Sequence, residues 1–219
     1  MAQKADTRFR PYARFLLTGA SGSGKTEWAI NLIRYRQVLF QKPPTYVKWY
    51  YRVYQDVYRT MLQSGLVQEV EEGIPSIGEV EELSKKYPNC LIVIDDPGQD
   101  RNLAVLADLF AVVARHNKVN VIVMTQNLFP RGRGARDVTL NATVLVLFRN
   151  LRDLNQISTF GRQFQPTKAK GFLDVYRDVT SDKAYSYLLL DFSQDLADNL
   201  RIRTDIFPWE YPQKVYILN

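Results

Sequence analysis

Cysteine and histidine are almost absent from the sequence, which contains one of each among 219 residues. The single Cys90 cannot form an internal disulfide, so we expect a reducing compartment, in which this thiol packs as a small hydrophobic side chain. His116 has no cysteine or histidine partners at zinc-ligand spacing. The 11 glycines and 10 prolines are too few for a collagen-like or low-complexity chain. The G-x-S-x-G motif of serine hydrolases is also missing.

Long apolar runs are absent as well. No stretch approaches the ~20 apolar residues that a membrane-spanning helix needs. The first residues, MAQKADTRFRPYARF, lack the apolar segment of a secretory signal. We therefore expect an intracellular protein with no membrane partner.

The composition is that of an ordinary globular protein. Hydrophobic residues make up 46% of the chain and charged residues 24%. This length favours one domain over residues 1–219, with a basic N-terminal arm (1–13) and a C-terminal extension (193–219). The net charge of +6 is compatible with a polyanionic partner such as nucleic acid, but the same excess is common in proteins that are simply soluble.

Apolar, β-branched runs alternate with segments of helical periodicity. We expect strands at 14–17, 46–54, 90–94, 120–125, 143–148 and 185–191. We expect helices at 25–36, 56–62, 77–86, 102–116, 153–164 and 169–179, and a Gly/Arg-rich loop at 130–137. This alternation predicts an α/β fold, an open and mainly parallel sheet with helices on both faces. The aromatic run YVKWYYRVY fits sheet interior better than an exposed platform for stacked bases.

A glycine-rich turn follows the first strand and precedes a helix. It matches G-x-x-x-x-G-K-[ST], the Walker A phosphate loop, in full. Its residues are Gly19, Ala20, Ser21, Gly22, Ser23, Gly24, Lys25 and Thr26. In such a loop, backbone N–H groups surround the phosphates of ATP, the lysine reaches the β- and γ-phosphates, and the Thr26 hydroxyl binds Mg²⁺. The alternative is a turn that only caps a helix.

Two adjacent carboxylates end the apolar run CLIVIDD. At the carboxyl end of a parallel strand, Asp95 would hold Mg²⁺ as a Walker B aspartate and Asp96 would orient or deprotonate the attacking water. Asp96 stands where many ATPases carry glutamate, which has one more methylene. The alternative is an acidic turn before Pro97.

A polar side chain also ends the next apolar strand, NVIVMT. Gln126 follows it directly and is our candidate for a sensor that touches both the γ-phosphate and the water; otherwise it forms a turn. Arginines cluster further on, at 131, 133, 136, 149 and 152. An arginine that reaches the γ-phosphate stabilises the transition state, although a single surface arginine is more often only solvated.

These motifs in this order resemble the viral genome-packaging ATPases of the FtsK/HerA superfamily, especially the small ones of Polinton-like and related double-stranded DNA viruses. The resemblance covers nearly the whole chain. It includes TGASGSGKT, YQDVY, EEGIPSI, LIVIDD, RHNKVNVIVMTQNLF, ARDVTLNATVLVLFRNLRDLNQI and LLLDFSQDLADNLRIRTDIFP. The stretch 115–157 is the most specific part.

The resemblance implies a RecA/FtsK-like P-loop ATPase that uses ATP and Mg²⁺. Such enzymes form homo-oligomeric rings and push double-stranded DNA into a preformed capsid, at a portal-type vertex protein. It makes Arg136, Arg149 and Arg152 the candidates for an arginine finger supplied by the neighbouring subunit. It also implies a location in the host cell, including the nucleus, or at the capsid. The Asp-Asp pair departs from the Asp-Glu of the cellular pumps, which leaves the general base less defined.

Three alternatives remain. A nucleoside or nucleotide kinase would use RGRGARD as a lid, but it has less need of an acidic pair placed for water. A GTPase is suggested by the D-x-x-G at 95–98 and by Asn117-Lys118, but this Asn-Lys precedes a strand, whereas the base-reading motif follows one. A nucleotide-binding capsid scaffold without turnover is the third.

Overall fold

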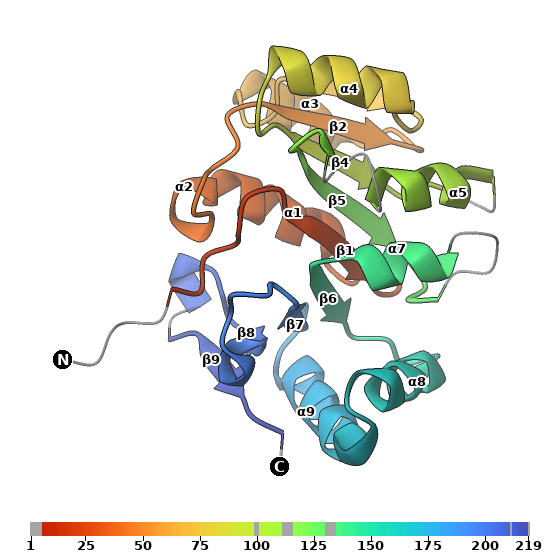
Figure 1. Cartoon of the computed structure of the whole chain (residues 1–219), viewed down its shortest axis with the longest axis vertical. Helices are drawn as coiled ribbons and strands as arrows, with labels where there is room; N and C mark the ends of the chain where they lie inside the picture. Colours follow the sequence, from red (N-terminus) through yellow and green to blue (C-terminus); the bar gives the residue numbers. More distant parts are fainter. Residues whose placement is uncertain (1–5, 99–100, 111–115, 130–134, 211, 219) are drawn as a thin grey trace.

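A single sheet runs through the protein. The computed structural model describes residues 6–98, 101–110, 116–129, 135–210 and 212–218, without the side chains of 101–104, 135 and 136. Nine strands in these ranges pair in the order β3-β2-β4-β5-β1-β6-β7-β8-β9 (Figure 1). They are β1 (Arg14–Thr18), β2 (Val47–Tyr51), β3 (Glu69–Glu72), β4 (Leu91–Asp95), β5 (Asn120–Thr125), β6 (Val144–Phe148), β7 (Tyr187–Asp191), β8 (Ile202–Thr204) and β9 (Lys214–Tyr216).

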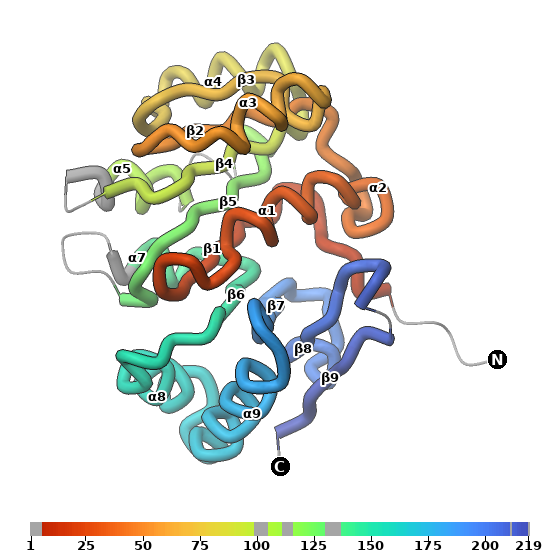
Figure 2. The backbone as a smooth tube through the Cα atoms, turned by 180° about the vertical axis from the view of Figure 1, so that it is seen from behind, coloured from red at the N-terminus to blue at the C-terminus, as the bar shows by residue number. Residues whose placement is uncertain are grey.

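Helices cover both faces of this sheet, as predicted. They are α1 (Lys25–Arg34), α2 (Arg36–Leu39), α3 (Asp56–Gln63), α4 (Ile77–Lys86), α5 (Arg101–Asp108), α7 (Ala135–Asn141), α8 (Leu154–Phe164) and α9 (Ala169–Asp182). Trp28 of α1 and Tyr58 of α3 belong to one hydrophobic cluster, whereas α4, α5, α8 and α9 pack into a second. Figure 2 accordingly shows α1 and α3 in front, on the face turned away in Figure 1.

The six strands from β3 to β6 in this order run parallel to one another. β1 lies at the centre, where Leu16 pairs with Val123 of β5 and Leu145 of β6. β4, β5 and β6 are buried along their whole length, because helices cover both of their faces. The carboxyl ends of β1, β4 and β5 therefore meet at one edge of the sheet, where ligands bind in open α/β folds.

The other three strands are antiparallel, and the sequence pattern predicted only one of them, β7. β8 and β9 lie in the predicted C-terminal extension, so this segment completes the sheet. The predicted basic arm is also partly buried, since Phe9 is only 2% exposed and forms a β-bridge with Phe40.

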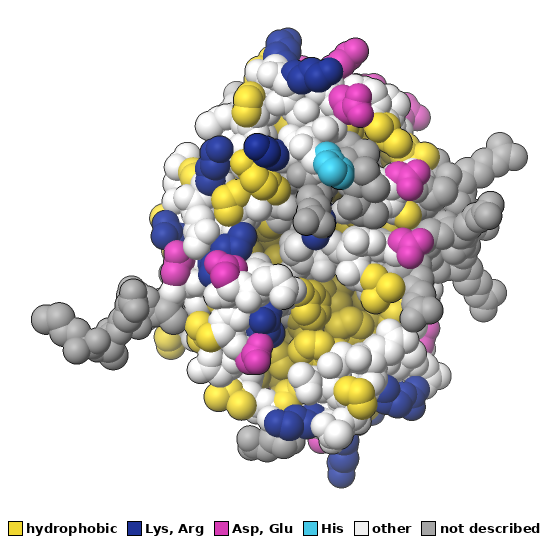
Figure 3. Space-filling view, in the orientation of Figure 1, with side chains coloured by type: hydrophobic (Ala, Val, Ile, Leu, Met, Phe, Trp, Pro, Cys, Tyr) yellow, Lys and Arg dark blue, Asp and Glu magenta, His cyan; other side chains and the backbone are white. Residues whose placement is uncertain are grey.

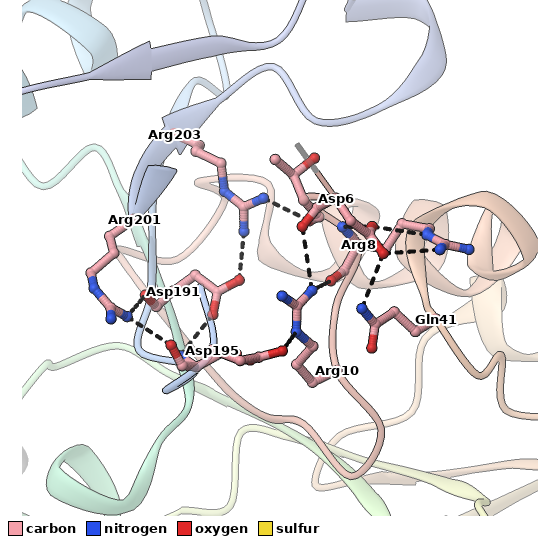
Figure 4. A network of polar contacts seen from close by, with 10 residues as sticks. Asp6, Arg8, Arg10, Gln41, Asp191, Asp195, Arg201 and Arg203 are labelled. Atoms are coloured by element: carbon pink, nitrogen blue, oxygen red, sulfur yellow. Dashed lines mark hydrogen bonds and ion pairs between the residues drawn. The ribbon is translucent and has the colours of Figure 1, made fainter. Parts of the chain in front are cut away.

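A polar network joins the two ends of the chain (Figure 4). The fully buried Arg203 of β8 pairs with Asp191 of β7 at 2.6 Å and donates to the backbone carbonyl of Thr7. Arg10 forms an ion pair with Asp195. The N-terminal segment thus packs against β7 and β8.

Several predicted elements differ from the structure. The predicted aromatic strand 46–54 is shorter, but it is core, since Trp49 and Tyr50 are buried. The predicted helix 102–116 begins at Arg101, and its residues 111–115 lie outside the described ranges. The predicted loop 130–137 ends too late, because α7 begins at Ala135. β3 and α2 were not predicted.

The surface carries basic and acidic side chains side by side. On the face seen in Figure 3 they are intermixed, and a hollow with a hydrophobic floor lies below the middle of this face. No helix among the described residues is long and apolar enough to cross a membrane.

Candidate functional site

The phosphate loop connects β1 to α1, as the sequence predicted. Gly22 (φ 73°) and Gly24 (φ 99°) adopt left-handed conformations that favour glycine. A Cβ on Gly19 would approach the Phe148 Cβ of β6 to 2.6 Å, so this position also has no room for a side chain. No side chain caps the first turn of α1, which leaves its N–H groups open toward the cavity beyond the loop.

Lys25 lies folded over the loop. Its Nζ donates to the carbonyls of Gly19 at 2.7 Å and Ala20 at 2.9 Å. Ser23 lines the cavity, and its buried hydroxyl has no hydrogen-bond partner within the described part of the chain. An open helix N-terminus, a lysine and an unpartnered hydroxyl in one place fit a phosphate group.

The end of β4 brings Asp95 against this loop. Its Oδ2 accepts hydrogen bonds from the Thr26 hydroxyl at 3.3 Å and from the Tyr58 hydroxyl of α3 at 3.0 Å. Burial raises the pKa of Asp95, and these two hydrogen bonds oppose the shift. Burial lowers the pKa of Lys25, against the attraction of Asp95 and Asp96. Neither charge has the solvation it would have in water, and a bound Mg·triphosphate would compensate both.

Asp96 differs from its neighbour in conformation and exposure. It is partly exposed and has a left-handed backbone, with φ 52°, which is uncommon for a non-glycine residue. This turn directs the chain out of the sheet directly after β4. The N–H of Gly98 lies 3.4 Å from its Oδ1, and the Arg52 guanidinium packs beside Gly98. Asp96 therefore lines the cavity without the hydrogen bonds that hold Asp95.

One cavity of about 670 Å³ joins most of the predicted site. Its lining includes the loop from Ser21 to Thr26, Asp95, Asp96 and Gln126. Gln126 is exposed and follows β5 directly, at the edge of the sheet where β4 also ends. The structure thus brings together the phosphate loop, the acidic pair and the polar side chain that three separate strands were predicted to supply.

The predicted arginines lie elsewhere. Arg149 and Arg152 are exposed on the loop after β6 and do not line the cavity. Arg136 belongs to α7, but its side chain is outside the described residues, as are Arg131 and Arg133. Within one chain, neither of the two described candidates thus lines the cavity at the phosphate loop.

The donor set fits Mg²⁺. The Thr26 hydroxyl and the Asp95 carboxylate are hard oxygen ligands beside the phosphate loop. Among the residues that the structure describes, no group of three or more His, Cys, Asp or Glu side chains could hold a metal by itself. Mg²⁺ is commonly bound by one or two protein oxygens together with substrate phosphates, which is the arrangement available here.

The sequence patterns missed two parts of the site. Tyr58 of α3 contacts Asp95. It is the last residue of the segment YQDVY, whose sequence pattern did not indicate a role in the site. The second part is the far side of the cavity, which is lined by Lys183, Tyr185, Trp209 and Glu210. These residues belong to no motif, and only the packing of the C-terminal segments beside α1 brings them to the site.

Known structures share this architecture. Three structures of the genome-packaging NTPase B204 from Sulfolobus turreted icosahedral virus 2 superpose over nearly the whole chain. The sulfate complex has a TM-score of 0.57 and 13% identity, and the match covers 94% of this chain and 97% of that one. The ATP-gammaS complex has a TM-score of 0.55, 15% identity and coverages of 95% and 98%. The AMPPCP complex has a TM-score of 0.57, 14% identity and coverages of 94% and 98%. This likeness establishes the α/β fold of a P-loop NTPase.

Sequence comparison defines the family. A search of curated proteins found no match. The family model described as Poxvirus A32 protein matches residues 4–131, which is more than half of the chain and includes the phosphate loop, the acidic pair and Gln126. The chain belongs to the poxvirus A32 protein family.

Proposed function

We propose that this protein is a viral genome-packaging ATPase, a motor that hydrolyses ATP to move double-stranded DNA into a preformed capsid. The observation that carries the proposal is the single cavity in which a phosphate loop, the Thr26–Asp95 oxygen pair and Asp96 meet. Binding of a nucleoside triphosphate alone would not require an acidic group beside the metal ligands. Hydrolysis does, because water must be oriented and lose a proton.

The comparisons support the packaging role. The chain belongs to a family described by a poxvirus protein, and B204 is a genome-packaging NTPase with structures in complex with ATP-gammaS and AMPPCP. We assign the protein to the FtsK/HerA superfamily on the resemblance of its motifs, close to the enzymes of Polinton-like viruses. Its site of action would be the host cell or the capsid.

The proposed reaction uses five side chains of one subunit. Lys25 moves from the loop carbonyls to the β- and γ-phosphates, and Thr26 and Asp95 would hold Mg²⁺. The bound metal would supply positive charge that stabilises the phosphates. Asp96 accepts the proton of the attacking water, and Gln126 contacts the water and the γ-phosphate from β5.

The positions of two arginines suggest that the subunits assemble into a ring. Arg149 and Arg152 flank Leu151, which is 77% exposed, on the loop after β6. Neither arginine lines the cavity of its own chain, and an adjacent subunit could present them to the next cavity. An exposed apolar residue between two basic ones fits a surface that packs against a second copy of the chain.

DNA contact is proposed for the Gly/Arg-rich segment before α7. The net charge is +6, yet the face seen in Figure 3 shows no single basic patch. A translocating motor meets every sequence in turn, so its contacts go to phosphates and its affinity falls with salt. Arg131 and Arg133 are the proposed contact residues.

The test is ATP hydrolysis by the purified chain, with and without duplex DNA, alongside its mass in solution. We expect Mg²⁺-dependent phosphate release, stimulation by duplexes of unrelated sequence, and loss of turnover in Lys25→Ala. Phosphate transfer only to an added nucleoside would identify a kinase. Nucleotide binding without any turnover would identify a scaffold, and either result would overturn the proposal.

A further inference from the structure

The cavity extends beyond the residues that phosphate chemistry uses. On one side of α1 it is lined by Asp95 and Asp96, next to α3. On the other side it is lined by segments from the end of the chain: Lys183, Ala184, Tyr185, Phe207, Trp209 and Glu210. We call these six residues the C-terminal wall.

The position of the acidic pair determines how a nucleotide lies in the cavity. α1 lies between α3, which contacts Asp95 through Tyr58, and the C-terminal wall, in which Phe207 packs on Trp28 of α1 at 5.6 Å. The metal and the attacking water belong on the α3 side, so the γ-phosphate must point there. The nucleoside then leaves the phosphate loop on the opposite side, against the C-terminal wall.

Two aromatic side chains on this wall are exposed. Tyr185 is 69% exposed and Trp209 is 53% exposed, although both line the cavity. The Tyr185 side chain lies against the phosphate loop, since a Cβ added to Gly24 would lie 3.1 Å from the Tyr185 Cβ. Its φ of 64° is a left-handed conformation that is uncommon for a tyrosine. The turn between α9 and β7 thus presents this ring beside the loop.

The Trp209 ring packs against two other aromatic rings. It stacks on Phe207 with ring centroids 4.8 Å apart and 3° between the planes, and its centroid lies 4.9 Å from that of Tyr35, the residue between α1 and α2. Over half of the side chain nevertheless stays exposed. A rigid, exposed aromatic surface at the nucleoside end of the cavity is suited to a flat apolar ring.

A carboxylate lies in the same wall. Glu210 Oε2 accepts hydrogen bonds from the Tyr187 hydroxyl at 2.8 Å and from the backbone N–H of Phe207 at 3.2 Å. Its Oε1 lies 3.9 Å from Lys183 Nζ. One carboxylate oxygen is therefore fixed, and the other can accept a hydrogen bond from a ribose hydroxyl or a base amino group.

We propose that the C-terminal wall is the nucleoside subsite of this ATPase, in which a base packs against Tyr185 and Trp209 and a nucleoside donor binds Glu210. This inference rests on the proposed function, because it takes the bound molecule to be a nucleoside triphosphate. It assigns recognition of the nucleoside to the end of the chain, outside the region matched by the family model.

The test compares ATP with inorganic triphosphate, which has the phosphates but no nucleoside. Each is bound with Mg²⁺ to the full chain and followed by calorimetry. The wild type should bind ATP more tightly than triphosphate. Trp209→Ala should weaken ATP binding about tenfold, the effect of losing one base–aromatic contact, and leave triphosphate binding unchanged. Tyr185→Asn, which tolerates the left-handed backbone, should act in the same direction.

Tryptophan fluorescence gives an independent signal. The chain has three tryptophans, of which Trp28 and Trp49 are buried and Trp209 is half exposed. Trp28 also lines the cavity, so both ligands can change the emission. ATP should add a change that triphosphate does not produce, and Trp209→Phe should remove that added change while ATP still binds. Ile217→Ala, another exposed residue near the C-terminus that does not line the cavity, is the matched control and should behave as wild type.

The outcomes separate the two proposals. If neither ATP nor triphosphate binds, the proposed function fails. If both bind but Trp209→Ala weakens them equally, or changes neither, the nucleoside lies elsewhere and the subsite is wrong while the ATPase proposal stands.

Discussion

Adjacent aspartates at the end of β4 have different surroundings, which supports different roles. Asp95 is the last residue of the strand, buried and hydrogen-bonded to Thr26 and Tyr58. Asp96 lies just beyond the end of β4, has a left-handed backbone conformation and is partly exposed. A metal ligand must be fixed, whereas a general base needs access to water. We therefore keep Asp95 as the proposed metal ligand and Asp96 as the proposed base.

This division predicts the behaviour of Asp96→Asn. The variant should still bind Mg·ATP, because Thr26 and Asp95 remain, but it should lose most hydrolysis. Binding and phosphate release are measured on the same preparation, with the circular dichroism spectrum as a check of folding. A folded variant that fails to bind Mg·ATP would make Asp96 a metal ligand instead.

The buried Asp95 carboxylate should also destabilise the protein without ligand. A carboxyl group with a raised pKa binds its proton more tightly in the folded protein than in the unfolded chain. Folding is therefore favoured as the pH falls through that pKa and disfavoured above it. Asp95→Asn keeps an acceptor for Tyr58 and Thr26 but carries no charge. At pH 8 it should raise the unfolding temperature by about 2–4 °C, the shift that roughly 1 kcal/mol produces in a chain of this size.

The pH dependence of the unfolding temperature distinguishes an effect of the Asp95 charge from an effect of packing. The stabilisation by Asp95→Asn should shrink as the pH is lowered toward 4, because the wild-type carboxyl group becomes protonated. Asp96→Asn, at a partly exposed position, is the control and should shift the unfolding temperature less. An Asp95→Asn effect that is equal at every pH would contradict the argument.

At the scale of elements, the sequence predicted the strands that helices cover and missed β3 at one edge of the sheet and β8 and β9 at the other end. β4, β5 and β6 are continuous apolar runs because both of their faces are buried. The edge strand β3 reads EVEE, a pattern of exposed charge. Its glutamates Glu69 and Glu71 form ion pairs with the buried Lys48 of β2, a tertiary contact that no local pattern encodes.

The residues of the candidate site could likewise be predicted from the sequence only in part. The phosphate loop, the acidic pair and Gln126 could be predicted because each follows a recognisable strand. Tyr58 and Trp209 could not, since they reach the cavity only through the packing of α3 and of the C-terminal segment beside α1.

Removing one member of the Arg203–Asp191 pair between β7 and β8 should destabilise the protein strongly. Both side chains are buried, so removing one leaves the other charge without compensation. Arg203→Ala should lower the free energy of unfolding by about 3–5 kcal/mol, measured by urea denaturation. The matched control is Asp198→Ala, which removes the Arg201–Asp198 pair; Asp198 is 94% exposed, and the cost should stay below about 1 kcal/mol. Equal effects of the two changes would contradict the structural role given to the buried pair.

For the whole molecule, the central question is whether one chain contains a complete site. The cavity supplies Lys25, Asp95 and Asp96 for the proposed reaction, but none of the described arginine candidates lines it. The exposed Arg149 and Arg152 lie on the loop after β6, at the carboxyl edge of the sheet. A site that is completed by a neighbour's arginine would make hydrolysis depend on assembly, and it would couple each site to the next around a ring.

Mixing two inactive variants tests this directly. Lys25→Ala destroys its own phosphate loop but keeps its arginines, and Arg152→Ala keeps its loop but lacks the proposed finger. In a mixed ring, some Arg152→Ala subunits receive an intact arginine from a Lys25→Ala neighbour, so hydrolysis should partly return. Mixing Lys25→Ala with Asp96→Asn is the control, because no subunit then has an intact cavity and nothing should return. The same experiment applies to Arg149 and Arg136. If assembled mixtures recover no activity for any of the three, the arginine acts within its own subunit or lies elsewhere.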